Sequence, residues 1–168
     1  MGTRPSIRVN AKLLRIYLQD HLAASTAGRE LARRARGSNE GTPYGEALAK
    51  LADELEADRR ALEGVLGDLG FGPDRPKNVA AWAAEKAGRL KLNGQLTGYS
   101  PLSRMVELEG LAVGVAGKLA LWRTLLELVD REPRLDRDRL ARLAARAERQ
   151  RETLDELRSS AAADAFTP

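Results

Sequence analysis

Apolar residues recur three and four positions apart in four long segments of this chain, a spacing that places them on one face of an α-helix. The segments cover residues 10–37, 42–70, 100–133 and 136–158. Glycine, proline and short polar residues separate them, as at helix ends. We therefore predict four helices of about 25 residues each, followed by a fraying tail at 159–163.

Four residues at the starts of these segments predict where the helices begin. Asn10, Thr42 and Ser100 each precede an apolar-periodic run and carry a side-chain oxygen that suits an N-cap, and the fourth helix is predicted to begin at Asp136. Pro43 follows Thr42 at the first helical position, where its missing N–H costs nothing.

The lengths of the connections predict the topology. Short turns at 37–42 and 131–135 require two antiparallel hairpins. The link at 70–99 is long enough to run the length of the bundle and to carry a short connecting helix near 76–92, with Trp82 anchoring it. We predict an all-α, ferritin-like four-helix bundle with one long crossover, as a single domain over 1–168 with a core at about 10–158 and flexible ends. A plain up-down-up-down bundle is the structural alternative.

The composition is typical of a helical protein and excludes several classes of catalytic and metal site. Hydrophobic residues make up 43% of the chain and aromatic residues only 4%, which disfavours a β-sandwich or barrel. The absence of a long apolar run or a secretion signal leads us to expect a cytoplasmic protein with no membrane partner. With no cysteine and a single histidine, His21, thiol catalysis, zinc fingers and sites that need two imidazoles are excluded.

Charge is distributed unevenly along the chain. The formal net charge is +4, residues 1–37 hold eight basic and two acidic residues, and residues 43–70 hold three basic and seven acidic residues. We expect these two segments to face each other. Arg33, Arg34 and Arg36 are interpreted first as a solvated helix end and second as an anion or nucleic-acid patch.

Two short motifs resemble those of YciF-type ferritin-like stress proteins. Residues 17–25 read Tyr-Leu-Gln-Asp-His-Leu-Ala-Ala-Ser, similar to the family's opening, and residues 62–70 resemble its second-helix close. The resemblance implies a ferritin-like bundle and a stress-related role.

The metal ligands that this resemblance implies are missing. Ferritin-like carboxylate sites use a Glu from each of two helices and a Glu-x-x-His from each of the other two, and this chain has no Glu-x-x-His. Ser25 aligns with the family's first-helix Glu, and Glu56 and Glu148 are followed three residues later by arginine. We therefore expect no metal, no cofactor and no catalytic residues.

Several polar residues nevertheless lie in or beside the apolar stripes. His21, Asp58 and Gln150 are within them, and Glu107 and Glu109 flank the third. We expect His21, Asp58 and Gln150 to converge and satisfy one another. The alternative is a metal site, whose residues are Asp20, His21, Asp58, Glu107 and Glu109.

The third segment is rich in small residues, with Gly110, Gly114 and Gly117 in its middle. Glycine costs about 1 kcal/mol against alanine inside a helix, so some packing must compensate. We favour close approach of a neighbouring helix; a subunit interface or a space for an apolar ligand are alternatives.

Together these observations predict a non-enzymatic, stress-related structural or interaction protein that forms a homodimer. The alternatives are a divergent metal-binding oxidase or metal-handling protein, and a nucleic-acid or anion binder that uses the basic first helix.

Overall fold

The computed structural model describes residues 9–72 and 98–167, which form four long α-helices and no strand. The helices are α1 (Ala11–Ser38), α2 (Gly45–Asp68), α4 (Pro101–Leu128) and α5 (Arg137–Phe166). The all-helical prediction is confirmed for this part of the chain. The connecting helix predicted near 76–92, with Trp82, lies outside the described residues.

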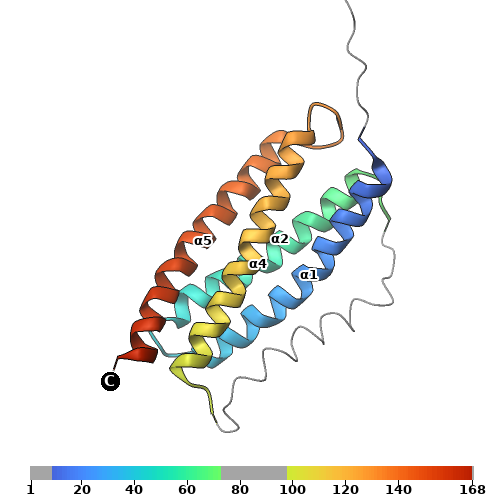
Figure 1. The fold of residues 1–168 in the computed structure, drawn as a ribbon. Helices are drawn as coiled ribbons and strands as arrows, with labels where there is room; N and C mark the ends of the chain where they lie inside the picture. The colour runs from blue at the N-terminus through green and yellow to red at the C-terminus, as the bar shows by residue number, and fades with distance from the viewer. Residues whose placement is uncertain (1–8, 73–97, 168) are drawn as a thin grey trace, which may run out of the picture.

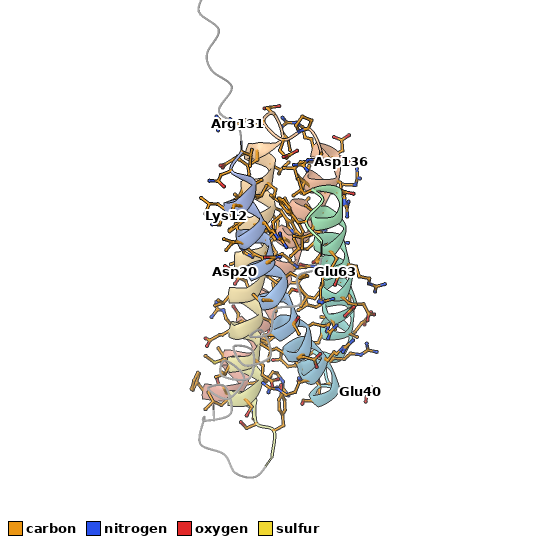
Figure 2. All side chains as sticks on the ribbon, turned by 90° about the vertical axis from the view of Figure 1, so that its right-hand side faces the viewer. Lys12, Asp20, Glu40, Glu63, Arg131 and Asp136 are labelled. Carbon is orange, nitrogen blue, oxygen red and sulfur yellow. The ribbon has the colours of Figure 1, made fainter. Side chains whose placement is uncertain are left out.

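The helices pack as two antiparallel hairpins, α1 with α2 and α4 with α5, and α1 lies against α4 (Figure 1). Lys12, Arg131 and Asp136 lie at one end of the bundle and Glu40 lies at the other (Figure 2). It follows that α2 and α4 run in the same direction, so that α2 ends and α4 begins at opposite ends of the bundle.

Two of the three predicted N-caps, Asn10 and Ser100, are confirmed, and Asp136 caps the fourth helix, which begins one residue after the predicted start. Asn10 Oδ1 accepts from Leu13 N (3.1 Å), and the Ser100 and Asp136 side chains accept from the backbone N–H three residues on. The prediction for Thr42 was wrong, because α2 begins at Gly45. Thr42 Oγ1 instead accepts from Tyr44 N (3.2 Å), so its hydroxyl stabilises the turn that precedes the helix.

Two predicted helix ends were also wrong. The tail at 159–163 does not fray, since α5 continues to Phe166. Ala161 is fully buried in the core, and the Tyr44 hydroxyl donates to Asp164 Oδ2 (2.6 Å), so core packing and a contact with the α1–α2 turn stabilise the last turns. At the other end of the bundle, α4 stops at Leu128, before the predicted 133.

The apolar stripes form two buried clusters, one toward each end of the bundle. Most of the apolar positions of the predicted stripes are buried, and Trp122 is fully enclosed in the core. The largest enclosed apolar side chains are Trp122, Leu18, Leu48, Leu69, Leu108, Leu111, Leu121, Leu125, Leu140, Leu154 and Val115. The four helices are therefore held together by these two apolar clusters, and any polar side chain buried with them needs a hydrogen-bond partner.

Within the described part of the chain, none of the helices carries a stretch apolar enough to cross a membrane.

Candidate functional site

Asp58 is the most deeply buried carboxylate of the described residues, only 3% exposed, and it lies on α2 where the stripes predicted it. The Lys118 ammonium donates to its Oδ2, and Arg146 Nε donates to its Oδ1 at 2.7 Å. Gln150 Nε2 also donates to Oδ2, at 3.1 Å. Both oxygens of Asp58 therefore accept from side chains of α4 and α5.

Gln150 connects this group to a second carboxylate. Its Nε2 donates to Glu54 Oε2 at 2.8 Å, and its Oε1 accepts from Lys118. We call these five residues the Asp58 network: Glu54, Asp58, Lys118, Arg146 and Gln150. Two acids and two bases give it no formal net charge, as expected for ions buried among aliphatic side chains.

Within the Asp58 network, Lys118 is the charged group that burial destabilises. Desolvation lowers the pKa of its ammonium, and the adjacent Asp58 carboxylate opposes that shift. A buried ammonium is tolerated here because it has two acceptors from two other helices.

The Asp58 network reaches solvent through Glu54, which lines an open groove between α2 and α5 together with Lys50 and Thr153. Glu54 is half-buried, whereas Gln150 behind it is only 2% exposed. Glu54 therefore lines the groove and accepts a hydrogen bond from the buried amide of Gln150.

His21 does not join Asp58 and Gln150, so that part of the predicted convergence was wrong. It is half-buried on α1, where its ring meets the edge of Tyr17 at 4.7 Å between centroids. Desolvation lowers the pKa of His21, and the nearby Asp20 raises it to a smaller extent. A neutral imidazole packed on an aromatic ring explains why it lies in an apolar stripe without an acidic partner.

Glu107 lies in a separate polar cluster, which we call the end network: Arg34, Asn39, Tyr44, Tyr99, Arg104, Glu107 and Asp164. Eleven residues of α4 separate Glu107 from Lys118, a distance of about 16 Å along the helix axis. Glu107 accepts from Arg34 Nε (2.7 Å) and from the Tyr99 hydroxyl (3.0 Å). Glu107 therefore binds a side chain of α1 and the tyrosine that lies just before α4.

The end network depends on one fully buried amide. Asn39 Nδ2 donates to Ala35 O and to the Tyr99 hydroxyl, both at 2.8 Å, and Asn39 Oδ1 accepts from Arg104 Nε (2.6 Å). Arg104 also stacks over the Tyr44 ring, 4.4 Å from its centroid. These contacts join the α1–α2 turn to the beginning of α4.

Desolvation raises the pKa of Tyr99 to about 12, and the Glu107 carboxylate adds to the rise. The phenol therefore remains protonated over the whole neutral range. It acts as a hydrogen-bond relay, accepting from Asn39 and donating to Glu107.

The other two residues of the alternative metal set lie on the surface. Asp20 is exposed on the outer side of α1 (Figure 2), and Glu109 is exposed on α4. Over residues 9–72 and 98–167, no three carboxylate, histidine or cysteine side chains are grouped closely enough to hold a metal ion. The structure thus places the five residues of that set in four different surroundings.

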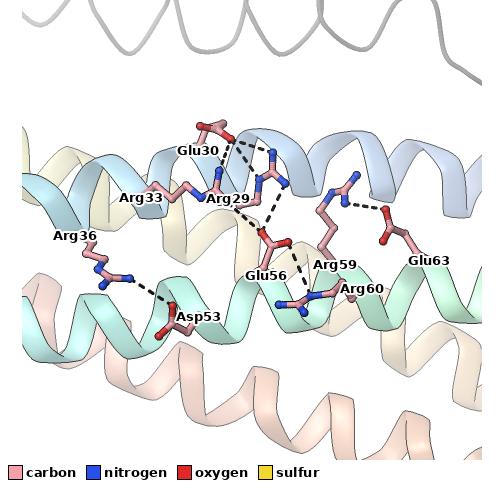
Figure 3. Close-up of polar contacts among 9 residues, drawn as sticks. All are labelled: Arg29, Glu30, Arg33, Arg36, Asp53, Glu56, Arg59, Arg60 and Glu63. Atoms are coloured by element: carbon pink, nitrogen blue, oxygen red, sulfur yellow. Dashed lines mark hydrogen bonds and ion pairs between the residues drawn. The ribbon is translucent and has the colours of Figure 1, made fainter.

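The basic first segment and the acidic second segment do face each other, as their charges predicted (Figure 3). Glu56 on α2 lies 3.6 Å from guanidinium nitrogens of both Arg29 and Arg33, and Arg36 lies 3.4 Å from Asp53. Arg34, on the other side of α1, pairs with Glu107. The arginines considered for an anion patch therefore have carboxylate partners within the bundle.

Sequence reasoning missed Lys118 and Arg146. Lys118 follows Leu111 and Val115 at core spacing and precedes Trp122, so its position in the buried register was a readable signal. Arg146 lies four residues before Gln150 on the same face of α5. The small residue Gly110 was read correctly, since a Cβ there would meet Leu31 Cδ2 at 3.0 Å.

No family model matches this chain, and neither a curated protein nor a solved structure shows significant similarity to it.

Proposed function

We propose that this chain is a non-enzymatic, ferritin-like bundle that lacks a di-iron site and acts as a structural or interaction protein. The observation that supports the proposal most directly is the double engagement of Asp58 by Lys118 and Arg146. In ferritin-like carboxylate proteins the bundle interior binds metal cations. In this chain, two protein cations neutralise the interior carboxylate.

The residues present do not fit a di-metal centre. Such a centre needs several carboxylates and at least two imidazoles converging on one volume. Asp58 and Glu54 are the carboxylates of the Asp58 network, the only histidine of the chain packs on Tyr17, and Glu107 is bound to Arg34. A divalent cation next to Asp58 would also have to displace Lys118 or lie beside its ammonium.

The shared direction of α2 and α4 supports the ferritin-like part of the proposal, because bundles with one long crossover have that arrangement. The stress-related role rests on the resemblance of residues 17–25 and 62–70 to YciF-type proteins. An oxidase or metal-handling function and a nucleic-acid binder have no comparable support among the described contacts.

Metal analysis of purified protein tests the proposal. The protein would be incubated without oxygen with Fe(II) or Mn(II), desalted and analysed by plasma mass spectrometry. We expect far less than one ion per chain and no change in melting temperature. One or two tightly bound ions per chain, with a higher melting temperature that a chelator reverses, would overturn the proposal in favour of a metal-dependent function.

The salt dependence of DNA or RNA binding tests the remaining alternative. Binding that weakens steeply with salt is expected of a protein that contacts several phosphates. We expect no such binding at physiological ionic strength, since the arginines of α1 are paired with Glu56, Asp53 and Glu107.

A further inference from the structure

The inward-facing side chains of α2 repeat every seven residues. Their positions alternate three and four apart, which is the spacing of a helix that packs on its neighbours over its whole length. In order they are Leu48, Leu51, Leu55, Asp58, Leu62, Val65 and Leu69. Because nearly all the apolar members are leucine, a shift of α2 by seven residues along its axis places leucine where leucine was. The apolar packing of α2 alone therefore does not select one height in the bundle.

The inward-facing side chains of α4 and α5 follow the same seven-residue repeat. The α4 series is Leu108, Leu111, Val115, Lys118, Trp122, Leu125 and Val129. The α5 series is Leu140, Leu143, Ala147, Gln150, Leu154, Leu157 and Ala161. In all three series only the middle member is polar. These middle members, Asp58, Lys118 and Gln150, are hydrogen-bonded to one another in all three pairs, so they form one polar layer between the two apolar clusters.

The covalent connections leave the relative height of the two hairpins open. One short turn joins α1 to α2 and another joins α4 to α5, so each turn fixes the height of its own two helices. The hairpins are joined to each other through residues 69–100, a connection several times longer than either turn. Non-covalent contacts must therefore set the height of α2 against α4 and α5.

The polar layer is an inefficient way to stabilise the bundle. Asp58 is only 3% exposed, and burial lowers the pKa of the Lys118 ammonium although the Asp58 carboxylate opposes that shift. Desolvation offsets the attraction within such buried ion pairs, and apolar side chains of similar volume often stabilise a fold equally well. A single polar position within an apolar repeat has another effect, because it selects one register of the packed helices while lowering their stability.

We propose that the layer of Asp58, Lys118 and Gln150 is a register device, which selects one height of the α1–α2 hairpin against the α4–α5 hairpin. A displacement by one seven-residue repeat, about 10.5 Å, would keep leucine in the packed positions of α2. It would separate Asp58 from both partners and leave buried charges among aliphatic side chains. The displaced arrangement is therefore excluded by unpaired polar groups and not by the shape of the apolar seams.

Two contacts between α1 and α4 are rival determinants of the same height. Leu31 Cδ2 lies over Gly110, where an added Cβ would meet it at 3.0 Å, and Arg34 Nε donates to Glu107 at 2.7 Å. If these contacts set the register, removing the polar layer will leave it unchanged. That outcome separates the two explanations.

Replacing the whole layer by apolar side chains tests the proposal. The variant Asp58→Leu/Lys118→Met/Gln150→Leu completes the apolar series of all three helices. Spin labels are attached at Glu46→Cys, near the start of α2, and at Ala141→Cys, near the start of α5. Both positions are exposed and lie toward opposite ends of the bundle, and the chain has no cysteine of its own. The label-to-label distance, measured by pulsed electron paramagnetic resonance, reports the height of α2.

We expect one distance for the labelled chain with its natural core. The apolar variant should show a second distance that differs by up to about 10 Å, with unchanged helicity and a melting temperature at least as high. The matched control Asp58→Asn/Lys118→Gln keeps an uncharged polar layer and should retain the single distance. A single, unchanged distance in the apolar variant, or two distances in the control, would overturn the proposal. Loss of the folded state in the apolar variant would also overturn it, because the layer would then be needed for stability.

Discussion

The Lys118 ammonium on α4 donates a hydrogen bond to the buried carboxylate of Asp58 on α2, linking two helices that run in the same direction. Arg146 and Gln150 of α5 bind the same carboxylate, so that one acidic side chain connects three helices. The consequence is that α2 is fixed to the α4–α5 hairpin by polar contacts in the middle of the bundle. Apolar side chains of α2 and α5 meet on either side of this polar layer, in the two core clusters.

Removing the charge of Asp58 should be far more damaging than removing an exposed one. We expect Asp58→Asn to lower the free energy of unfolding by about 3 kcal/mol, since Lys118 would remain buried without a counter-charge. The matched control is Asp53→Asn, whose side chain is 77% exposed beside Arg36 and should cost less than about 1 kcal/mol. Urea denaturation of both variants measures the difference, and similar losses would contradict the role assigned to Asp58.

The single histidine allows a direct titration by NMR. Burial lowers the pKa of His21 below 6.5, so the unfolded chain takes up its proton first as the pH falls. Stability contributed by the neutral imidazole is therefore complete above 6.5 and decreases as the pH falls toward the lowered folded pKa. Asp20→Asn should lower the pKa of His21 further, because Asp20 is the group that raises it. A pKa above 6.5 would indicate an acidic partner and contradict the observed packing on Tyr17.

The raised pKa of Tyr99 predicts that the free energy of unfolding decreases at alkaline pH. Its folded pKa is about 12, against 10.0 for a free phenol, so the folded chain retains a proton that the unfolded chain releases. The stabilisation is complete below pH 10 and is lost as the pH rises through about 12. Tyr99→Phe should show a smaller decrease over that interval, measured by urea denaturation at several pH values. Parallel curves for the two proteins would show that Tyr99 titrates normally.

The end of α5 should matter although it lies near the C-terminus of the sequence. Ala161 is fully buried and Ala163 two residues later is exposed. Ala161→Glu should lower the free energy of unfolding by about 3 kcal/mol or more, because it places an unpaired charge in the core, while Ala163→Glu should change it by less than about 0.5 kcal/mol. Thermal or urea unfolding separates the two cases, and equal effects would mean that these last turns are not packed.

Helical periodicity predicted most of the fold because burial on one face repeats every three to four residues. It placed Asp58 and Gln150 in the interior correctly, and both are nearly inaccessible. It failed at the tail of α5, because the partners of Ala161 and Asp164 are remote in sequence and a run of small residues has no local signal of its own. Helix ends depend on such tertiary contacts, which periodicity does not encode.

The candidate site was predicted less well than the fold. His21 was expected near Asp58 because both lie in apolar stripes, but a stripe does not specify which neighbouring helix a residue faces at a given height. Lysine and arginine are usually surface residues, but the long side chains of Lys118 and Arg146 reach the buried carboxylate of Asp58. Identifying the partners of Asp58 therefore required the relative heights of three helices, which follow only from their packing.

Anomalous diffraction from crystals grown with excess Fe(II) tests most directly whether protein cations, and not metal ions, neutralise Asp58. The account predicts no iron signal within bonding distance of the Asp58 carboxylate, with Lys118 and Arg146 both in contact with its oxygens. A fully occupied iron ion between Asp58 and Gln150, with the Lys118 side chain turned away, would contradict it.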